Sequence, residues 1–153
     1  MKNKIQLSIV LAGLMFLSCK EQTQNKTEYL AVNSISQLSE HPGKKLMETY
    51  CYVCHNPTAS HDNRLAPPMI AIKKHYTNSD TTKEEFVNSI QAWIKNPNIE
   101  DAKMFGAVRR FGVMVKQPFP EDEIKLIAEY MFDNDIEQPE WFEQHEKEMK
   151  NKQ

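Results

Sequence analysis

The sequence predicts an all-α protein. Three segments carry apolar side chains at helical spacing, and no alternating strand pattern or internal repeat competes with them. The chain has 153 residues, of which 40% are hydrophobic and 26% charged, with a formal net charge of −2. This length suits one domain, and the apolar content is too high for a wholly disordered chain. Because there is no excess of basic residues, we expect no nucleic acid partner.

The first two expected helices are separated by a polar, proline-bearing loop. Residues 44–51 form the first helix, and the loop follows at residues 56–68. The second helix begins with a capping box, in which Thr82 precedes Glu85 by three residues, and it ends before Pro97. Its apolar face consists of Phe86, Ile90, Trp93 and Ile94.

The third expected helix lies near the C-terminus. It begins at Pro120, has three acidic residues in its first turn and ends near Asp133. Its buried stripe consists of Ile124, Ile127, Ala128 and Met131. Residues 138–153 form a charged tail, which we expect to be a short helix with Trp141 and Phe142 packed back on the domain.

The first 18 residues have the pattern of a signal peptide. Two lysines precede a mostly apolar stretch, residues 5–17, that is shorter than the about 20 apolar residues needed to span a membrane. Its end, Leu-Met-Phe-Leu-Ser-Cys19, resembles the lipobox of bacterial lipoproteins. That resemblance implies cleavage before Cys19 and acylation of this residue, whereas an ordinary secretory signal is the alternative.

These features predict an exported lipoprotein, anchored to a bacterial membrane and facing the periplasm or the cell surface. Residues 19–40 would then be the lipidated N-terminus and a flexible tether, since residues 20–28 contain no large apolar side chain. Loss of two lysines with the signal peptide takes the net charge of the chain to −4. The folded domain is expected over residues 41–137.

The remaining two cysteines form the motif Cys51-Tyr-Val-Cys54-His55. A C-x-x-C-H motif is the pattern of covalent c-type haem attachment. The two thiols add to the two vinyl groups of haem, and the adjacent imidazole reaches the iron from the same segment. Haem c attachment requires export, which agrees with the signal peptide.

Three other interpretations of these residues are open from the sequence. A thioredoxin-like dithiol would follow a strand within a βαβ unit. A zinc site could combine the two cysteines with two histidines chosen from His55, His61 and His75. A structural disulfide between the two cysteines would close a very small loop and leave the adjacent histidine unexplained.

The order of these elements resembles that of the class I monohaem cytochromes c. This resemblance implies a small helical domain around one haem, with His55 as the proximal ligand. It implies that the carbonyl of Pro67 orients the His55 ring through its other nitrogen, and that Trp93 contacts a haem propionate. Packing in the core is the alternative role of Trp93.

The same resemblance implies an axial methionine on the loop before the last helix. Met114, six residues before Pro120, is the expected iron ligand, and Met104, seven residues after Pro97, is the runner-up. Neither has the following proline that is usual in the family. A histidine ligand or an open position is the third possibility.

The sequence therefore predicts an electron carrier rather than an enzyme, tethered to a membrane by lipid and active as a monomer. Its partners would be redox proteins that donate and accept one electron. A haem-based sensor or ligand-binding protein and a haem subunit of a larger oxidoreductase are the alternatives.

Overall fold

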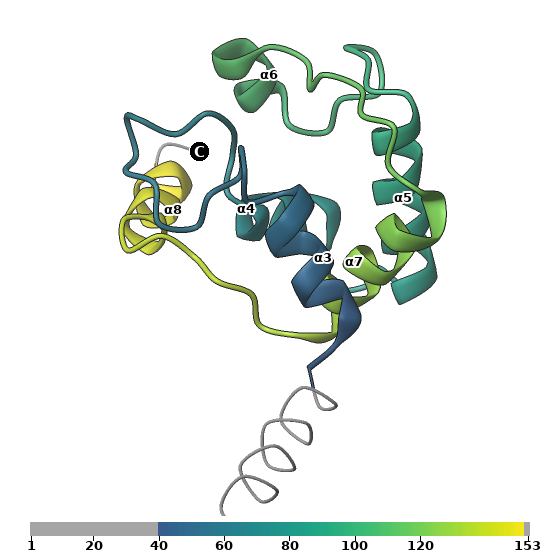
Figure 1. Cartoon of the computed structure of the whole chain (residues 1–153). Helices are drawn as coiled ribbons and strands as arrows, with labels where there is room; N and C mark the ends of the chain where they lie inside the picture. Colours follow the sequence, from purple (N-terminus) through teal and green to yellow (C-terminus); the bar gives the residue numbers. More distant parts are fainter. Residues whose placement is uncertain (1–39, 152–153) are drawn as a thin grey trace, which may run out of the picture. The chain divides into compact units, whose positions relative to one another are not determined.

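The computed structural model describes residues 40–151, and this part of the chain is entirely helical (Figure 1). It contains six helices and no strand: α3 (Pro42–Tyr50), α4 (Met69–Tyr76), α5 (Lys83–Lys95), α6 (Phe105–Phe111), α7 (Glu121–Asp133) and α8 (Phe142–Lys150). The all-α prediction is confirmed for these residues. The predicted signal peptide, Cys19 and nearly all of the tether lie outside them. Within the described residues, no helix is long and apolar enough to cross a membrane.

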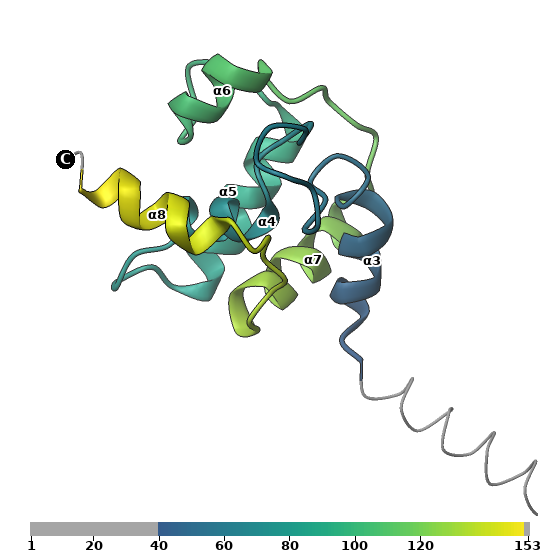
Figure 2. The same ribbon diagram turned by 90° about the vertical axis from the view of Figure 1, so that its left-hand side faces the viewer.

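Helix α3 crosses α7 at close range, as both views show (Figures 1 and 2). Gly43 permits this, because a Cβ atom there would lie 2.0 Å from the backbone oxygen of Leu126 on α7. His41 caps α3, and its Nδ1 accepts a hydrogen bond from the Gly43 N–H at 3.1 Å. The crossing therefore sets the direction in which α3 delivers the segment that follows it.

Helices α5 and α7 pack together and bury the stripes that the sequence predicts. The capping box of Thr82 and Glu85 is present at the start of α5. Pro120 is the N-cap of α7 rather than its first residue, so this helix starts one position later than expected. The most deeply buried large side chains of the core are Phe86, Met47 and Met131.

The expectation of three helices in residues 41–137 is wrong, because the structure has five there. Helix α4 is a continuous apolar run, Met69–Ile72, followed by three residues with basic side chains, and it lacks the polar spacing of an amphipathic helix. Helix α6 has only seven residues, none of them buried, and its N-cap makes no side-chain hydrogen bond. Neither helix has the local signals that predict a helix from sequence, namely apolar residues at helical spacing and a side-chain cap.

The C-terminal tail packs on the domain, as the sequence predicts. Phe142 is buried at the start of α8, and the indole of Trp141 donates a hydrogen bond to the Ala59 carbonyl at 2.9 Å. The Arg64 guanidinium lies 4.6 Å from the centre of the Trp141 ring. These contacts join α8 to the 56–68 loop on the side of the domain that Figure 2 turns toward the viewer.

Candidate functional site

The C-x-x-C-H motif lies at the end of α3, where the helix passes into tight turns. Cys51 is the C-cap residue, and its N–H donates to the Met47 carbonyl. The N–H groups of Cys54 and His55 both donate to the Cys51 carbonyl, at 3.1 and 2.8 Å. These bonds hold the five residues in one compact turn, and both thiols and the imidazole line the same cavity.

His55 is held by the loop that begins immediately after it. Its Nδ1 lies 2.6 Å from the carbonyl oxygen of Pro67, which is the contact that the resemblance to class I cytochromes c implies. Because a carbonyl only accepts hydrogen bonds, Nδ1 carries the proton and Nε2 keeps its lone pair. Burial lowers the pKa of His55, and the hydrogen bond to Pro67 opposes this only in part. The ring is therefore neutral at neutral pH, the form that binds a metal.

The cavity beside this histidine has a volume of about 570 Å³ and mostly apolar walls. This volume falls within the range of about 300–1,000 Å³ that is typical of small-molecule and cofactor sites. Its walls come from residues 49–55, residues 65–76, α5, residues 102–119 and Ile124 of α7. Among residues 40–151, no aspartate or glutamate lines it, and Lys103 is the one lysine or arginine that does. The site suits a large, mostly apolar ligand rather than a highly charged one.

Both candidate methionines line this cavity, as does Trp93. Met104 is the N-cap of α6 and packs against the hydrophobic core, whereas Met114 lies beyond α6 and has no part in the core cluster. The Met104 side chain thus has a packing role that Met114 lacks. Trp93 is half-buried on α5, and within the described residues no hydrogen bond involves its indole N–H.

The geometry disfavours the three other interpretations of the cysteines. Both Cys51 and Cys54 are free thiols rather than a disulfide. Among residues 40–151, no three side chains of His, Cys, Asp or Glu come together in a way that could hold a metal ion, so the four ligands of a zinc site are not assembled there. The cysteines follow a helix, and burial raises the pKa of Cys51 to about 12, whereas redox-active thiols have lowered values.

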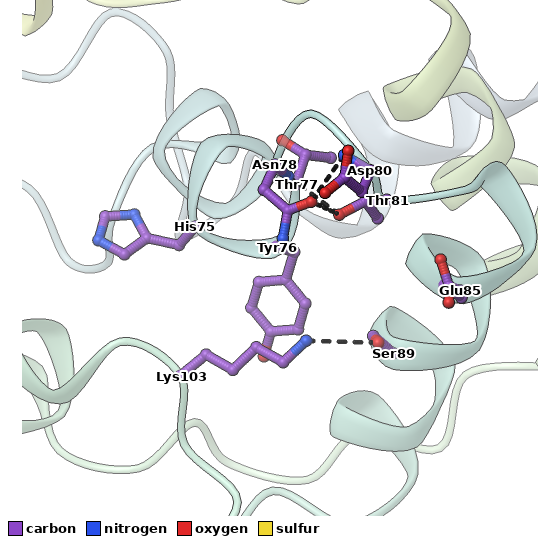
Figure 3. A pocket seen from close by; sticks show the side chains of 9 residues that line it. All are labelled: His75, Tyr76, Thr77, Asn78, Asp80, Thr81, Glu85, Ser89 and Lys103. Atoms are coloured by element: carbon purple, nitrogen blue, oxygen red, sulfur yellow. Dashed lines mark hydrogen bonds between the residues drawn. The ribbon is translucent and has the colours of Figure 1, made fainter.

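A second, polar hollow shares lining residues with this cavity, and Figure 3 shows the side chains around it. Tyr76 and Lys103 line both spaces. The Lys103 ammonium lies 4.6 Å from the centre of the Tyr76 ring and 3.4 Å from the Ser89 hydroxyl, as the dashed line in Figure 3 shows. His75, also at this hollow, bonds through Nδ1 to the Ala71 carbonyl of its own helix and does not face the main cavity.

Sequence reasoning missed four aromatic residues of the main cavity, namely Tyr50, Tyr76, Phe111 and Phe119. Phe119 stacks on Tyr50 with ring centres 4.9 Å apart, and the Tyr50 hydroxyl lies 2.5 Å from a Glu123 carboxylate oxygen on α7. Tyr76 ends α4, a helix that the sequence did not predict. A signal for Phe119 was available, because it directly precedes the Pro120 that marks the start of the last helix.

The fold and the site together define an all-α protein with an apolar cavity beside a C-x-x-C-H turn. Comparisons of the chain with models of known protein families, with curated proteins and with solved structures find no match. The function is therefore inferred from the residues of the site.

Proposed function

We propose that this protein is a membrane-tethered, extracytoplasmic one-electron carrier of the class I monohaem cytochrome c type. The observation that carries the proposal is the hydrogen bond between His55 and the Pro67 carbonyl beside the apolar cavity. His55 ends the C-x-x-C-H turn, and both cysteines of this turn line the same cavity. This combination supplies both covalent attachment points and an oriented, neutral imidazole. It supports the presence of one haem c, bound through Cys51 and Cys54.

The donor set of the cavity fits that cofactor. When bound, haem c supplies an iron that takes up and releases one electron at a time. The Pro67 carbonyl fixes the tautomer of His55, leaving Nε2 as the iron ligand. Met114 is the proposed sixth ligand, because its thioether is available in the cavity without a competing place in the core. The free indole N–H of Trp93 is the proposed donor to a propionate.

A histidine and a methionine as axial ligands argue for electron transfer rather than catalysis. With His55 and Met114 both bound to the iron, no position would remain on it for a substrate. A neutral thioether favours the reduced iron more than an imidazole does, and therefore raises the reduction potential. The apolar walls of the cavity act in the same direction, because burial disfavours the additional positive charge of the oxidised iron.

The proposal is tested by producing the exported protein in a bacterium that matures c-type cytochromes. We expect a haem signal that survives denaturing electrophoresis, and its loss in a Cys51→Ala, Cys54→Ala double variant. Cys19→Ala is the matched control, since it should retain haem while releasing the protein from the membrane. A colourless wild-type protein would refute the proposal.

The choice of the sixth ligand is tested with Met114→Ala and Met104→Ala in parallel. Met114→Ala should lower the reduction potential and remove the sulfur-to-iron charge-transfer band at the red end of the spectrum. Met104→Ala should keep that band and lose stability instead, because it removes a side chain from the core. The reverse pattern would assign Met104 as the ligand.

Carbon monoxide separates the carrier from a haem-based sensor. A wild-type reduced protein with both axial positions filled should be indifferent to the gas, whereas rapid stoichiometric binding would favour the sensor. Met114→Ala is the positive control, since it opens one axial position.

A further inference from the structure

The loop that carries Pro67 has little burial of its own. None of residues 56–67 is buried, and the loop belongs to no helix. Its internal hydrogen bonds close short turns, such as those in which Asn56 accepts from the N–H groups of Thr58 and Ala59. Turns of this kind shape a loop without fixing it to the rest of a domain. The position of the Pro67 carbonyl therefore depends on contacts from other elements.

The strongest of these contacts come from Trp141, the N-cap residue of α8. Its indole N–H donates to the Ala59 carbonyl at 2.9 Å, and the Arg64 guanidinium lies 4.6 Å from the centre of its ring. The His61 ring meets the indole edge-on, with ring centres 5.0 Å apart. Helix α6 adds a hydrogen bond from Arg110 to the His61 carbonyl. One indole thus contacts the loop at three positions.

Helix α8 also holds the helix that follows Pro67. Phe142 is buried in the core at the start of α8, and the Lys74 ammonium of α4 lies 5.1 Å from the centre of its ring. Lys74 also pairs with the carboxylate of Glu146 on α8. Because α4 begins at Met69, α8 contacts the chain both before and after Pro67.

The segment between these two contacts is short and stiff. Only Leu65, Ala66, Pro67 and Pro68 separate Arg64 from α4. Each proline fixes its own φ near −65°, and a residue that precedes a proline is restricted to extended backbone. The second restriction applies to Ala66 and to Pro67 itself. With both ends of the segment held, the Pro67 carbonyl has little freedom to turn.

We propose that Trp141 is a positioning residue for His55: by holding the 56–68 loop, it keeps the Pro67 carbonyl 2.6 Å from the Nδ1 atom of His55. The C-terminal helix would then serve the site without entering it, since no described residue of α8 lines the main cavity. A hydrogen bond of this kind orients a metal-binding histidine. Its effect on the iron rests on the function proposed above, whereas the positioning of His55 needs no haem.

The test follows one proton, the Nδ1–H of His55, in the reduced full-length protein labelled with nitrogen-15 in histidine. Nuclear magnetic resonance measures how fast this proton exchanges with water. Exchange should be slow in the wild type, and Trp141→Ala should speed it by about tenfold, because the loop then opens more often. Trp141→Phe should have a smaller effect, since a ring remains for Arg64 to stack on. Arg64→Ala should also speed the exchange.

Thr82→Ala is the matched control for Trp141→Phe, because each variant loses one hydrogen-bonded contact of a helix N-terminus. Thr82 caps α5 and bonds to Glu85, so its loss should lower stability without opening the 56–68 loop. Exchange at His55 should be as slow in Thr82→Ala as in the wild type. Equal acceleration in Thr82→Ala and Trp141→Phe would overturn the proposal, since unfolding of the whole domain would then expose the proton. This comparison decides the question even where Trp141→Ala does not fold.

The positioning role and the proposed function fail separately. A protein that lacks haem but shows this pattern of exchange would refute the proposed function and support the role of Trp141. A haem protein in which the Trp141 and Arg64 variants exchange as slowly as the wild type would overturn the role of Trp141 and leave the proposed function standing.

Discussion

Substituting Gly43 by alanine tests whether the close crossing of α3 and α7 holds the domain together. The new Cβ atom would lie 2.0 Å from the backbone oxygen of Leu126, 2.6 Å from its backbone carbon and 2.8 Å from the Cβ of Tyr130. Atoms at these distances overlap, and the main obstacle is backbone, which cannot rotate away. The two helices must therefore separate by roughly 1 Å or more to reach ordinary contact.

The expected cost follows from two opposing effects. Overpacking a well-packed interface costs about 1–3 kcal/mol, and a clash with backbone belongs at the upper end of that range. Alanine is favoured over glycine within a helix by about 1 kcal/mol, which offsets part of the cost. The net loss should be about 2 kcal/mol, which lowers the melting temperature of a domain of this size by roughly 8 °C.

Thermal unfolding followed by far-ultraviolet circular dichroism measures this loss, with Gly106→Ala as the control. Gly106 lies within α6, and a Cβ atom there would meet nothing within 4 Å, so its substitution should be neutral or slightly stabilising. Under the proposed function, Gly43→Ala should also reduce the yield of protein with attached haem, because α3 carries Cys51 at its other end. Equal melting temperatures for the two variants would refute the close crossing.

Three further predictions concern other parts of the domain. Thr82→Ala removes the capping box of α5 and should cost about 1 kcal/mol in urea unfolding, whereas no change would mean that the cap does not form in solution. Trp141→Phe keeps an aromatic ring but loses the hydrogen bond to the Ala59 carbonyl, so about 1 kcal/mol of stability should be lost and limited proteolysis of the tail should be faster. Proteolysis as slow as in the wild type would argue against this hydrogen bond. Burial raises the pKa values of Tyr52 and Tyr76 above the ordinary value of 10.0. Their neutral forms therefore stabilise the fold below pH 10, and this contribution should disappear as the pH rises through the raised values. The urea concentration at the unfolding midpoint should decrease as the pH rises above 10, and it should decrease less steeply in Tyr76→Phe. A midpoint that does not depend on pH would contradict the burial of both phenols.

The helices that could be predicted from the sequence are those with complete local signals. Helix α5 has a capping box, an apolar stripe and a proline after its end, so its bounds follow from neighbouring residues alone. Helix α6 has none of these, and its exposed residues contribute nothing to the buried core. It forms one wall of a cavity whose other walls come from distant parts of the chain. No local pattern encodes such a helix.

Local sequence signals also predict only part of the candidate site. Gly112 explains why Met114 was harder to place than the cysteines. The cysteines and His55 lie within one turn, so their spacing alone brings them together. Met114 reaches the cavity only because the chain changes direction after α6, at Gly112, with φ 79° and ψ 179°. That region of backbone space is essentially restricted to glycine, at a cost of about 1–3 kcal/mol for other residues. Since Gly112 is the one residue with positive φ among those described, the direction of this segment, and with it the candidate ligand, depends on that residue.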